Sequence, residues 1–247
     1  MLRSLVAALR FLTIAPIPGQ SGMAGDDLAR STPYFPLVGL LIGLACAPLA
    51  WLLSLLLPPA VAAVLVTTLL FAVSGGLHLD GLADTADGLF SARSRERMLA
   101  IMRDSRIGAM GVIALVVLLL LKVTALASLD RDRLPAAVVL MPVAGRCAIL
   151  VMMALLPYAR PEGGLGTLFY SRRSRLAGLW AVGFFLACAW LVTGAAGPGV
   201  AGFTLAMLVP FVLFIKARLG GATGDTLGAA CELAELFVAL AFSCTLW

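Results

Sequence analysis

Apolar stretches of about 20 residues, the length that a helix needs to cross a bilayer, alternate with short polar segments along most of this chain. Each stretch therefore predicts one membrane-spanning helix. The seven expected spans cover roughly 36–57, 60–79, 108–128, 136–157, 176–195, 199–216 and 226–246. The pattern predicts an all-α polytopic membrane helix bundle that forms a single domain over residues 1–247.

The first 18 residues follow a different pattern. Leu5 and Leu9 recur at helical spacing, opposite Arg3 and Arg10. A helix with one apolar and one basic face lies in the plane of the membrane interface. We therefore expect residues 1–18 to form an amphipathic interfacial helix, and a frayed terminus is the alternative.

The chain has few charged residues, and they are unevenly placed. Of its 247 residues, 62% are hydrophobic and 13% are charged, whereas soluble domains have about 25% charged residues. Lys and Arg are concentrated in the N-terminal segment and in or beside the segments 80–107, 158–175 and 217–225. Because basic loops stay on the cytoplasmic side, we expect these three segments to be cytoplasmic and the C-terminus to lie outside. The net charge of +5 then reflects topology and does not indicate a nucleic-acid partner.

Three aspartates, Asp80, Asp84 and Asp87, follow the second expected span. On a helix their spacing places all three within an arc of about 60°. Two carboxylates ~5.5 Å apart repel by roughly 3 kcal/mol at an effective dielectric of about 20, and a divalent cation removes that cost. Carboxylates are suitable ligands for Mg²⁺, and phosphate oxygens and water complete its coordination shell. The run predicts a Mg²⁺ site, and a solvated helix end is the alternative.

A second polar segment opens the third expected span. Arg103 and Arg106 have the fork geometry that grips phosphate oxygens, and Asp104 between them can bind a metal or orient an arginine. A basic membrane anchor is the alternative for these arginines.

A third segment, rich in glycine, precedes the last span. Gly220, Gly221, Thr223 and Gly224 lead into Asp225, and backbone N–H groups at a helix start can hold a phosphate. Asp225 could cap that helix or bind a metal. The spacing matches no standard phosphate-binding motif, so a flexible loop is the alternative.

Some charges fall inside expected spans, where an unpaired charge is costly. Glu232 and Glu235 lie in the last span, Arg146 in the fourth and Lys122 in the third. An intramembrane ion pair that fixes helix packing is the simplest interpretation, with Lys122 pairing or snorkelling. A metal or substrate role for Glu232 is the alternative.

The histidine and cysteine residues of the chain argue against other kinds of metal or catalytic site. His78 is the only histidine, so a His-based metal site and a serine triad are excluded. Five cysteines are scattered through apolar segments without metal-ligand spacing, and they are expected to pack as small apolar residues.

Four segments together resemble the cobalamin synthase family, the adenosylcobinamide-GDP ribazoletransferases. They are 34–39 (YFPLVG), 78–88 (HLDGLADTADG), 102–111 (MRDSRIGAMG) and 220–235 (GGATGDTLGAACELAE). They occur in the family's order and span nearly the whole chain. One segment alone would be weak evidence, but the combination is specific.

The resemblance implies a reaction and a location. The 3′-hydroxyl of α-ribazole, or of its 5′-phosphate, attacks the cobinamide-linked phosphorus of adenosylcobinamide-GDP, giving adenosylcobalamin or its 5′-phosphate and GMP. Mg²⁺ is the implied cofactor. The bacterial inner membrane is the implied location, with the active face toward the cytoplasm, and a homo-oligomer remains possible.

The expected site draws on all of these segments. The expected catalytic residues are Asp80, Asp84, Asp87, Asp104 and Asp225. The expected substrate-binding residues are His78, Arg103, Arg106, Gly220, Gly221, Thr223 and Gly224. The expected metal ligands are Asp80, Asp84, Asp87 and Glu232.

Three other classes of membrane protein are the alternatives. Phospho-alcohol transferases and membrane prenyltransferases also use Asp-rich Mg²⁺ sites. In the first class an arginine follows the aspartate motif, and that arginine is missing after Asp84. The second class has two Asp-rich segments, whereas Asp225 is a single aspartate. A transporter would show polar residues at mid-membrane and internal repeats, and no clear repeat is present.

Overall fold

The computed structural model describes residues 2–20, 22, 25–160, 169–170 and 174–244. Within these ranges it is helical, with one isolated bridge between Tyr158 and Ala222. The helices are α1 (Leu2–Leu12), α2 (Gly25–Ala29), η1 (Thr32–Tyr34), α3 (Phe35–Leu56), α4 (Pro59–Val73), α5 (Leu77–Leu89), α6 (Arg95–Ile101), α7 (Ala109–Ala127), α8 (Arg133–Leu155), α9 (Ser174–Thr193), η3 (Gly194–Ala196), α10 (Gly197–Leu219) and α11 (Gly224–Ser243). This confirms the expected all-α class.

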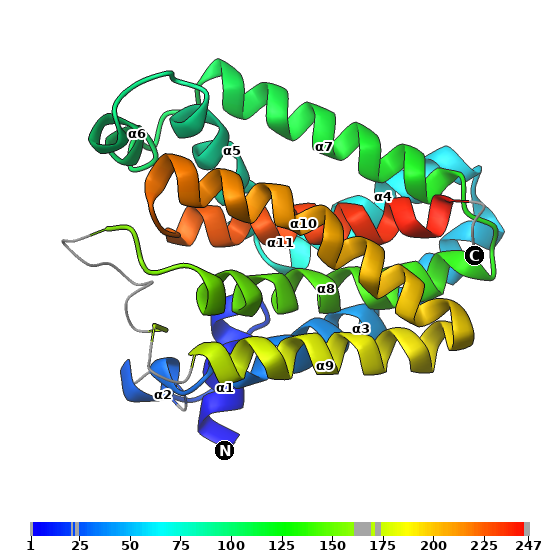
Figure 1. Ribbon diagram of the computed structural model, residues 1–247. Helices are drawn as coiled ribbons and strands as arrows, with labels where there is room; N and C mark the ends of the chain where they lie inside the picture. The colour runs from blue at the N-terminus through cyan, green and yellow to red at the C-terminus, as the bar shows by residue number, and fades with distance from the viewer. Residues whose placement is uncertain (1, 21, 23–24, 161–168, 171–173, 245–247) are drawn as a thin grey trace.

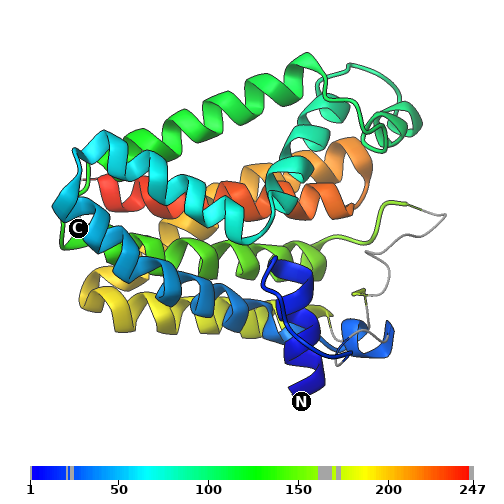
Figure 2. The ribbon, with the colours of Figure 1, turned by 180° about the vertical axis from the view of Figure 1, so that it is seen from behind.

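The long helices run beside one another, with α8 and α11 in the middle of the bundle (Figures 1 and 2). In the most apolar part of α8 and of α11, 83% of the residues are buried, against 28% in α7. Large side chains such as Leu120 and Val116 therefore point outward from α7. An apolar helix that exposes one face of this kind suits contact with lipid, so the fold is that of a multi-pass membrane protein.

Glycines allow the central helices to approach closely. A Cβ added to Gly39 of α3 would collide with the carbonyl oxygen of Pro142 in α8, and one added to Gly43 would collide with that of Val139. Small residues at such crossings are typical of helix packing in membranes, where close backbone contact replaces the hydrophobic effect as the driving force.

Five segments are long and apolar enough to span a membrane, or six if α4 and α5 are taken as one broken span. One of the five, Leu176–Leu219, contains both α9 and α10, which lie side by side in both views (Figures 1 and 2). The expected count of seven is compatible with this arrangement but stays a prediction.

The second expected span, 60–79, is wrong at its end. Helix α4 stops at Val73, and α5 continues at an angle of 91° to it. Gly75 and Gly76 have φ values of 61° and 74°, a left-handed conformation that glycine adopts without strain. This turn directs the aspartates of α5 across the end of the bundle, instead of along the α4 axis.

The N-terminal helix is shorter than expected, because α1 ends at Leu12. It crosses the bundle near the end that holds α2 and α6, which we call the α6 end (Figure 1). Its small residues Ala7 and Ala8 are buried, whereas Leu5 and Leu9 are only partly covered and Leu2 is exposed. Leu12 is fully buried, and Leu5 and Leu9 pack against the core, so α1 is anchored to the bundle through part of its leucine face, and its place at the membrane interface stays a prediction.

Candidate active site

Helices α5 and α11 cross at a pair of glycines at the α6 end of the bundle. A Cβ added to Gly81 would lie 2.8 Å from the carbonyl oxygen of Asp225, and one added to Gly228 would lie 3.3 Å from the Cα of His78. The close crossing brings His78 and Asp80 of α5 beside Asp225 of α11, although about 145 residues separate them in sequence.

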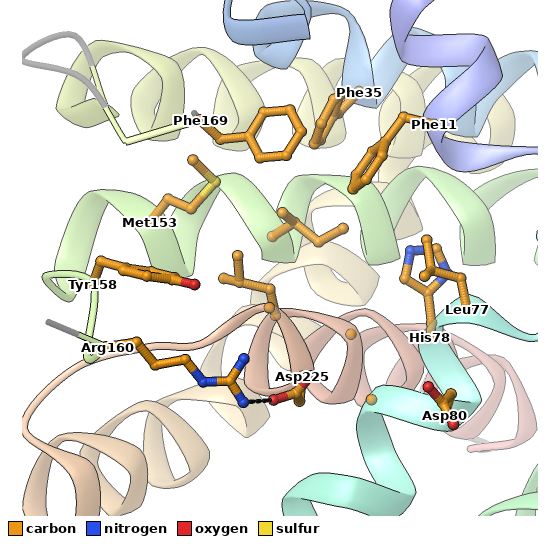
Figure 3. Close-up of a pocket in the computed structure, with 15 residues that line it drawn as sticks. Phe11, Phe35, Leu77, His78, Asp80, Met153, Tyr158, Arg160, Phe169 and Asp225 are labelled. Atoms are coloured by element: carbon orange, nitrogen blue, oxygen red, sulfur yellow. Dashed lines mark hydrogen bonds and ion pairs between the residues drawn. The ribbon is translucent and has the colours of Figure 1, made fainter. Parts of the chain in front are cut away.

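A cavity of about 300 Å³ opens beside this crossing. Figure 3 shows three phenylalanine rings on one side and the polar groups of α5, α11 and the segment after α8 on the other. The residues that line it are Phe11, Phe35, Leu77, His78, Asp80, Gly81, Ile149, Met153, Tyr158, Arg160, Phe169, Gly224, Asp225, Leu227 and Gly228. It thus combines an apolar aromatic wall with charged groups, as small-molecule sites do.

The charged side of the cavity is held by an ion pair that the sequence did not reveal. Nη2 of Arg160 donates to Oδ2 of Asp225 at 2.5 Å, and the hydroxyl of Thr223 lies 3.2 Å from the same oxygen. Both charged side chains are mostly buried. The pair fixes the Asp225 carboxylate at the start of α11, facing the cavity.

Backbone pairing positions Arg160. The backbone N–H of Ala159 donates to Ala222 at 2.8 Å, and that of Ala222 donates to Pro157 at 2.8 Å. Arg95 of α6 adds hydrogen bonds to the carbonyl oxygens of Leu219 and Ala159. The segment after α8 is thereby fastened to the glycine-rich loop.

Most of that loop has a structural role, which corrects part of the expected phosphate cradle. Gly220 ends α10 with a φ of 70°, and a Cβ on Gly221 would collide with the carbonyl oxygen of Pro157. Thr223 caps α11 in a capping box with Thr226. Of the four expected substrate-binding residues here, only Gly224 lines the cavity.

Two carboxylates on α5 have no hydrogen-bond donor among the described residues: Asp80, which faces the cavity (Figure 3), and Asp84, one turn later. The pKa of Asp84 is raised to about 7 by burial first, and then by the negative charges of Asp80, Asp225 and Asp87. The α6 end therefore carries negative charge that the protein itself only partly neutralises.

Asp87 follows Asp84 on the same face of the continuous helix α5, as the spacing predicts, but its carboxylate is already bound by the start of α7. Its carboxylate accepts hydrogen bonds from the backbone N–H groups of Gly108, at 2.6 Å, and Gly111, at 2.8 Å. These are orphan donors at the start of α7, where a carboxylate also interacts favourably with the helix dipole. A Cβ on Gly111 would lie 2.5 Å from Asp87, so the glycines make room for this cap.

Asp104 and Arg106 pair with each other and line neither this cavity nor the groove described below. Nη2 of Arg106 donates to Oδ2 of Asp104 at 2.6 Å, and the Arg106 side chain is 86% exposed. This pairing lowers the pKa of Asp104 to about 2. Arg103 is also exposed and lies outside the cavity lining. The expected roles of these three residues at the reacting groups are not supported by this arrangement.

Glu232 lies in a buried ion network, as the simpler interpretation of the sequence expected. Lys122 donates to Glu232 at 2.6 Å and to Glu235 at 2.9 Å, and Arg146 donates to Glu235 at 2.5 Å. Glu232 is not among the residues that line the cavity. Because the ammonium group of Lys122 already binds the Glu232 carboxylate, the structure does not support Glu232 as a metal ligand.

His78 is 3% exposed and lies in the cavity wall. Its Nδ1 has no hydrogen-bond partner among the described residues. A buried polar atom without a partner is costly, so this unsatisfied atom in the cavity wall is a feature that a ligand-binding role would explain.

The chemistry of the acidic residues fits Mg²⁺ in one specific way. Among the described residues, no three His, Cys, Asp or Glu side chains converge closely enough to hold a metal ion alone. Mg²⁺, however, commonly binds to one or two carboxylates and takes substrate phosphates and water as its other ligands. Asp80 and Asp84, which lack donors, match such a site.

Sequence reasoning missed the aromatic wall and Arg160. Phe11 and Phe169 have ring centroids 4.9 Å apart, and Phe35 and Phe169 lie 5.6 Å apart. These rings come from α1, α3 and the segment before α9. In the sequence they are ordinary apolar residues, and Arg160 looks like one more basic loop residue, so no local signal marks them.

The sequence as a whole is similar to one protein family. A family model described as cobalamin-5-phosphate synthase matches residues 4–243. Several proteins named adenosylcobinamide-GDP ribazoletransferase are similar over nearly their full length. The one from Roseiflexus sp. is 46% identical over 241 residues, covering 95% of this chain and 86% of the relative.

Two further relatives with this name give the same result. The one from Klebsiella pneumoniae is 42% identical over 245 residues, covering 98% of this chain and 99% of the relative. The one from Desulforamulus reducens is 41% identical over 239 residues, covering 96% and 95%. No solved structure matches the chain.

Proposed function

This chain belongs to the cobalamin-5-phosphate synthase family and has the family's ribazoletransferase activity, and we propose that the reaction takes place at the cavity between α5, α8 and α11. The reaction joins the cobinamide phosphate of adenosylcobinamide-GDP to the 3′-hydroxyl of α-ribazole or its 5′-phosphate and releases GMP. Membership of this family sets aside the prenyltransferase and transporter alternatives.

The observation that carries this location is the coincidence of three features in one cavity. Within the described part of the chain, Asp80 has no hydrogen-bond donor, the Arg160–Asp225 pair lies opposite the aromatic wall, and Nδ1 of the buried His78 has no partner. Phosphoryl transfer depends mainly on positioning and on neutralising charge. A cavity with carboxylates for a cation and an arginine for an anion meets both needs.

The residues of the cavity have distinct proposed roles. Asp225, held by Arg160 and Thr223, accepts the proton of the attacking hydroxyl. Arg160 lies close enough to this carboxylate to stabilise charge that develops on phosphate oxygens. Structure favours Asp225 over Asp104 as the base, because Asp104 is exposed and bound to Arg106.

Asp80 and Asp84 are the proposed ligands of Mg²⁺. Bound there, Mg²⁺ would supply charge neutralisation for the diphosphate of the nucleotide substrate. Both carboxylates come from one turn of α5, so the rigid helix sets their separation before any substrate binds.

We further propose that the α6 end faces the cytoplasm of a bacterial inner membrane. Fourteen Lys and Arg residues of the sequence lie in or beside the segments assigned to this side, and two lie on the other. Such a bias is the usual determinant of orientation. The nucleotide substrate and Mg²⁺ are both available on that side.

A turnover assay on the purified protein in lipid nanodiscs tests the site. With adenosylcobinamide-GDP and α-ribazole, we expect GMP release that EDTA abolishes and Mg²⁺ restores. Asp80→Asn should lower kcat by about 10²–10³-fold, the range seen when one group that stabilises the transition state is removed. It should leave the unfolding temperature unchanged.

Asp104→Asn is the matched control, because it makes the same chemical change at the same end of the bundle but outside the cavity. It should stay within about threefold of the wild-type rate, since exposed ion pairs contribute little. Near-normal turnover by Asp80→Asn would reject the proposed site.

A further inference from the structure

A second cavity, of about 700 Å³, lies on the other side of Asp80. It is a groove between the end of α1, the turn before α5 and the start of α7. The residues that line it are Arg10, Phe11, Thr13, Ile14, Ser74, Gly75, Gly76, Leu77, Leu79, Asp80, Ala83, Ile107 and Leu115. Three of these, Phe11, Leu77 and Asp80, also line the first cavity.

The shared wall contains one charged residue, Asp80. A reaction between two substrates needs both reacting atoms within about 3–3.5 Å of each other, so two separate binding cavities are useful only where they meet. Asp80 marks that meeting point, and it is also the carboxylate that the proposed function gives to Mg²⁺.

We propose that the two cavities separate the two substrates: the 300 Å³ cavity takes α-ribazole, and the groove takes the cobinamide part of adenosylcobinamide-GDP. This inference rests on the proposed function. The ribazole 3′-oxygen then forms its bond to the cobinamide-linked phosphorus beside Asp80. The bond from that phosphorus to the bridging oxygen breaks, GMP leaves with that oxygen, and the hydroxyl proton passes to Asp225.

The first cavity suits a nucleoside with a flat base. Its volume is near the lower end of the range for small-molecule sites, about 300–1,000 Å³, and a corrin ring with its side chains exceeds it. The rings of Phe35 and Phe169 offer an aromatic wall for stacking. Figure 3 shows His78 beside this wall and Arg160 and Asp225 across from it, where the ribose would lie.

The groove suits a large amphipathic ligand. Its edge includes Ile14 and Ile107, which are 67% and 56% exposed, so its apolar wall continues onto the surface of the bundle. A ligand larger than the groove can therefore lie against these side chains and remain partly outside. Arg10, Thr13, Ser74 and Asp80 supply the polar side chains of the lining.

Kinetics with both substrates varied independently test this partition. Phe35→Leu and Phe169→Leu keep apolar volume but remove the aromatic face. Each should raise KM for α-ribazole by about 2- to 10-fold, the equivalent of one aromatic contact, and leave KM for adenosylcobinamide-GDP unchanged. Ile14→Ala and Ile107→Ala should show the opposite pattern.

Matched controls change the same residue types outside both cavities. Phe214→Leu, on α10, and Ile113→Ala, on α7, should change neither KM. Equilibrium dialysis of labelled α-ribazole alone should show weaker binding to Phe35→Leu and Phe169→Leu and wild-type binding to Ile107→Ala.

Each outcome either supports or rejects the separation of the two substrates. Crossed changes in the two KM values support the partition. If the phenylalanine variants raise KM for adenosylcobinamide-GDP, or if both sets change both KM values together, the partition is wrong. It can be wrong while Asp80→Asn is inactive, in which case the proposed site stands and only the assignment of substrates is lost.

Discussion

Two groups of charged side chains lie on or beside α11, and they differ in whether their charges are paired. In the buried network, Lys122 and Arg146 neutralise Glu232 and Glu235, and all four residues are at most 5% exposed. At the α6 end, Asp80 and Asp84 have no donor among the described residues. Paired charges of this kind fasten helices together, whereas the carboxylates of Asp80 and Asp84 are the proposed ligands of a cation.

The same acidic residue type thus has different consequences at the two places. A buried carboxylate is tolerated only with a counter-charge, because the low dielectric makes an isolated charge very costly. A partly exposed carboxylate keeps some contact with water and can remain charged without a partner. The comparison predicts that variants of the network change stability and that variants at the α6 end change activity.

The largest expected effect concerns the network. Lys122→Met removes the one ion-pair partner that Glu232 has among the described residues and leaves a buried charge unpaired, which should destabilise the protein by about 3–5 kcal/mol. Thermal unfolding in nanodiscs measures this. The double variant Lys122→Met/Glu232→Gln should recover part of the loss, because it removes both charges.

The activity of these variants sharpens the comparison. At a temperature where Lys122→Met is folded, its kcat should stay close to that of the wild type. If Lys122→Met keeps its unfolding temperature and loses turnover, the network has a chemical role and the division into structural and chemical charges is wrong.

An intermediate effect concerns pH. The pKa of Asp84 is raised to about 7 because burial and neighbouring carboxylates disfavour its charged form. Below that pH the carboxyl holds a proton that Mg²⁺ must displace, so Mg²⁺ affinity should rise by up to about tenfold per pH unit below 7 and level off above it. Calorimetric titration with Mg²⁺ between pH 5.5 and about 8.5 measures this.

Asp84→Asn is the control for this prediction. The variant should bind Mg²⁺ more weakly at high pH and should lose most of the pH dependence near 7. An unchanged pH dependence in Asp84→Asn would assign the titrating group to another residue.

The smallest expected effect concerns Asp87, whose carboxylate caps α7. Asp87→Ala removes this cap and should lower stability by about 0.5–2 kcal/mol. Turnover at saturating Mg²⁺ should fall much less than in Asp80→Asn. A loss of turnover as large as that of Asp80→Asn would show that Asp87 acts in the metal site, as the sequence predicted.

The sequence also shows where local patterns stop being informative. The run Asp80, Asp84 and Asp87 predicts a metal site formed by all three carboxylates, and the helix does form, but the start of α7 binds the Asp87 carboxylate. Similarly, three glycines before α11 indicate a phosphate site, although Gly221 is required by the backbone of Pro157. In both cases the deciding contact comes from a segment distant in sequence.

By itself, the sequence determined the helical class, most helix positions and the spacing of the three aspartates along one helix, because hydrophobic length and helical spacing are local properties. The tertiary structure alone decided the 91° turn before α5, the pairing of Arg160 with Asp225 and the aromatic wall. These features depend on which helices meet. For example, the close crossing of α5 and α11 at Gly81 and Gly228 brings His78 and Asp80 beside Asp225, and no local pattern specifies that crossing.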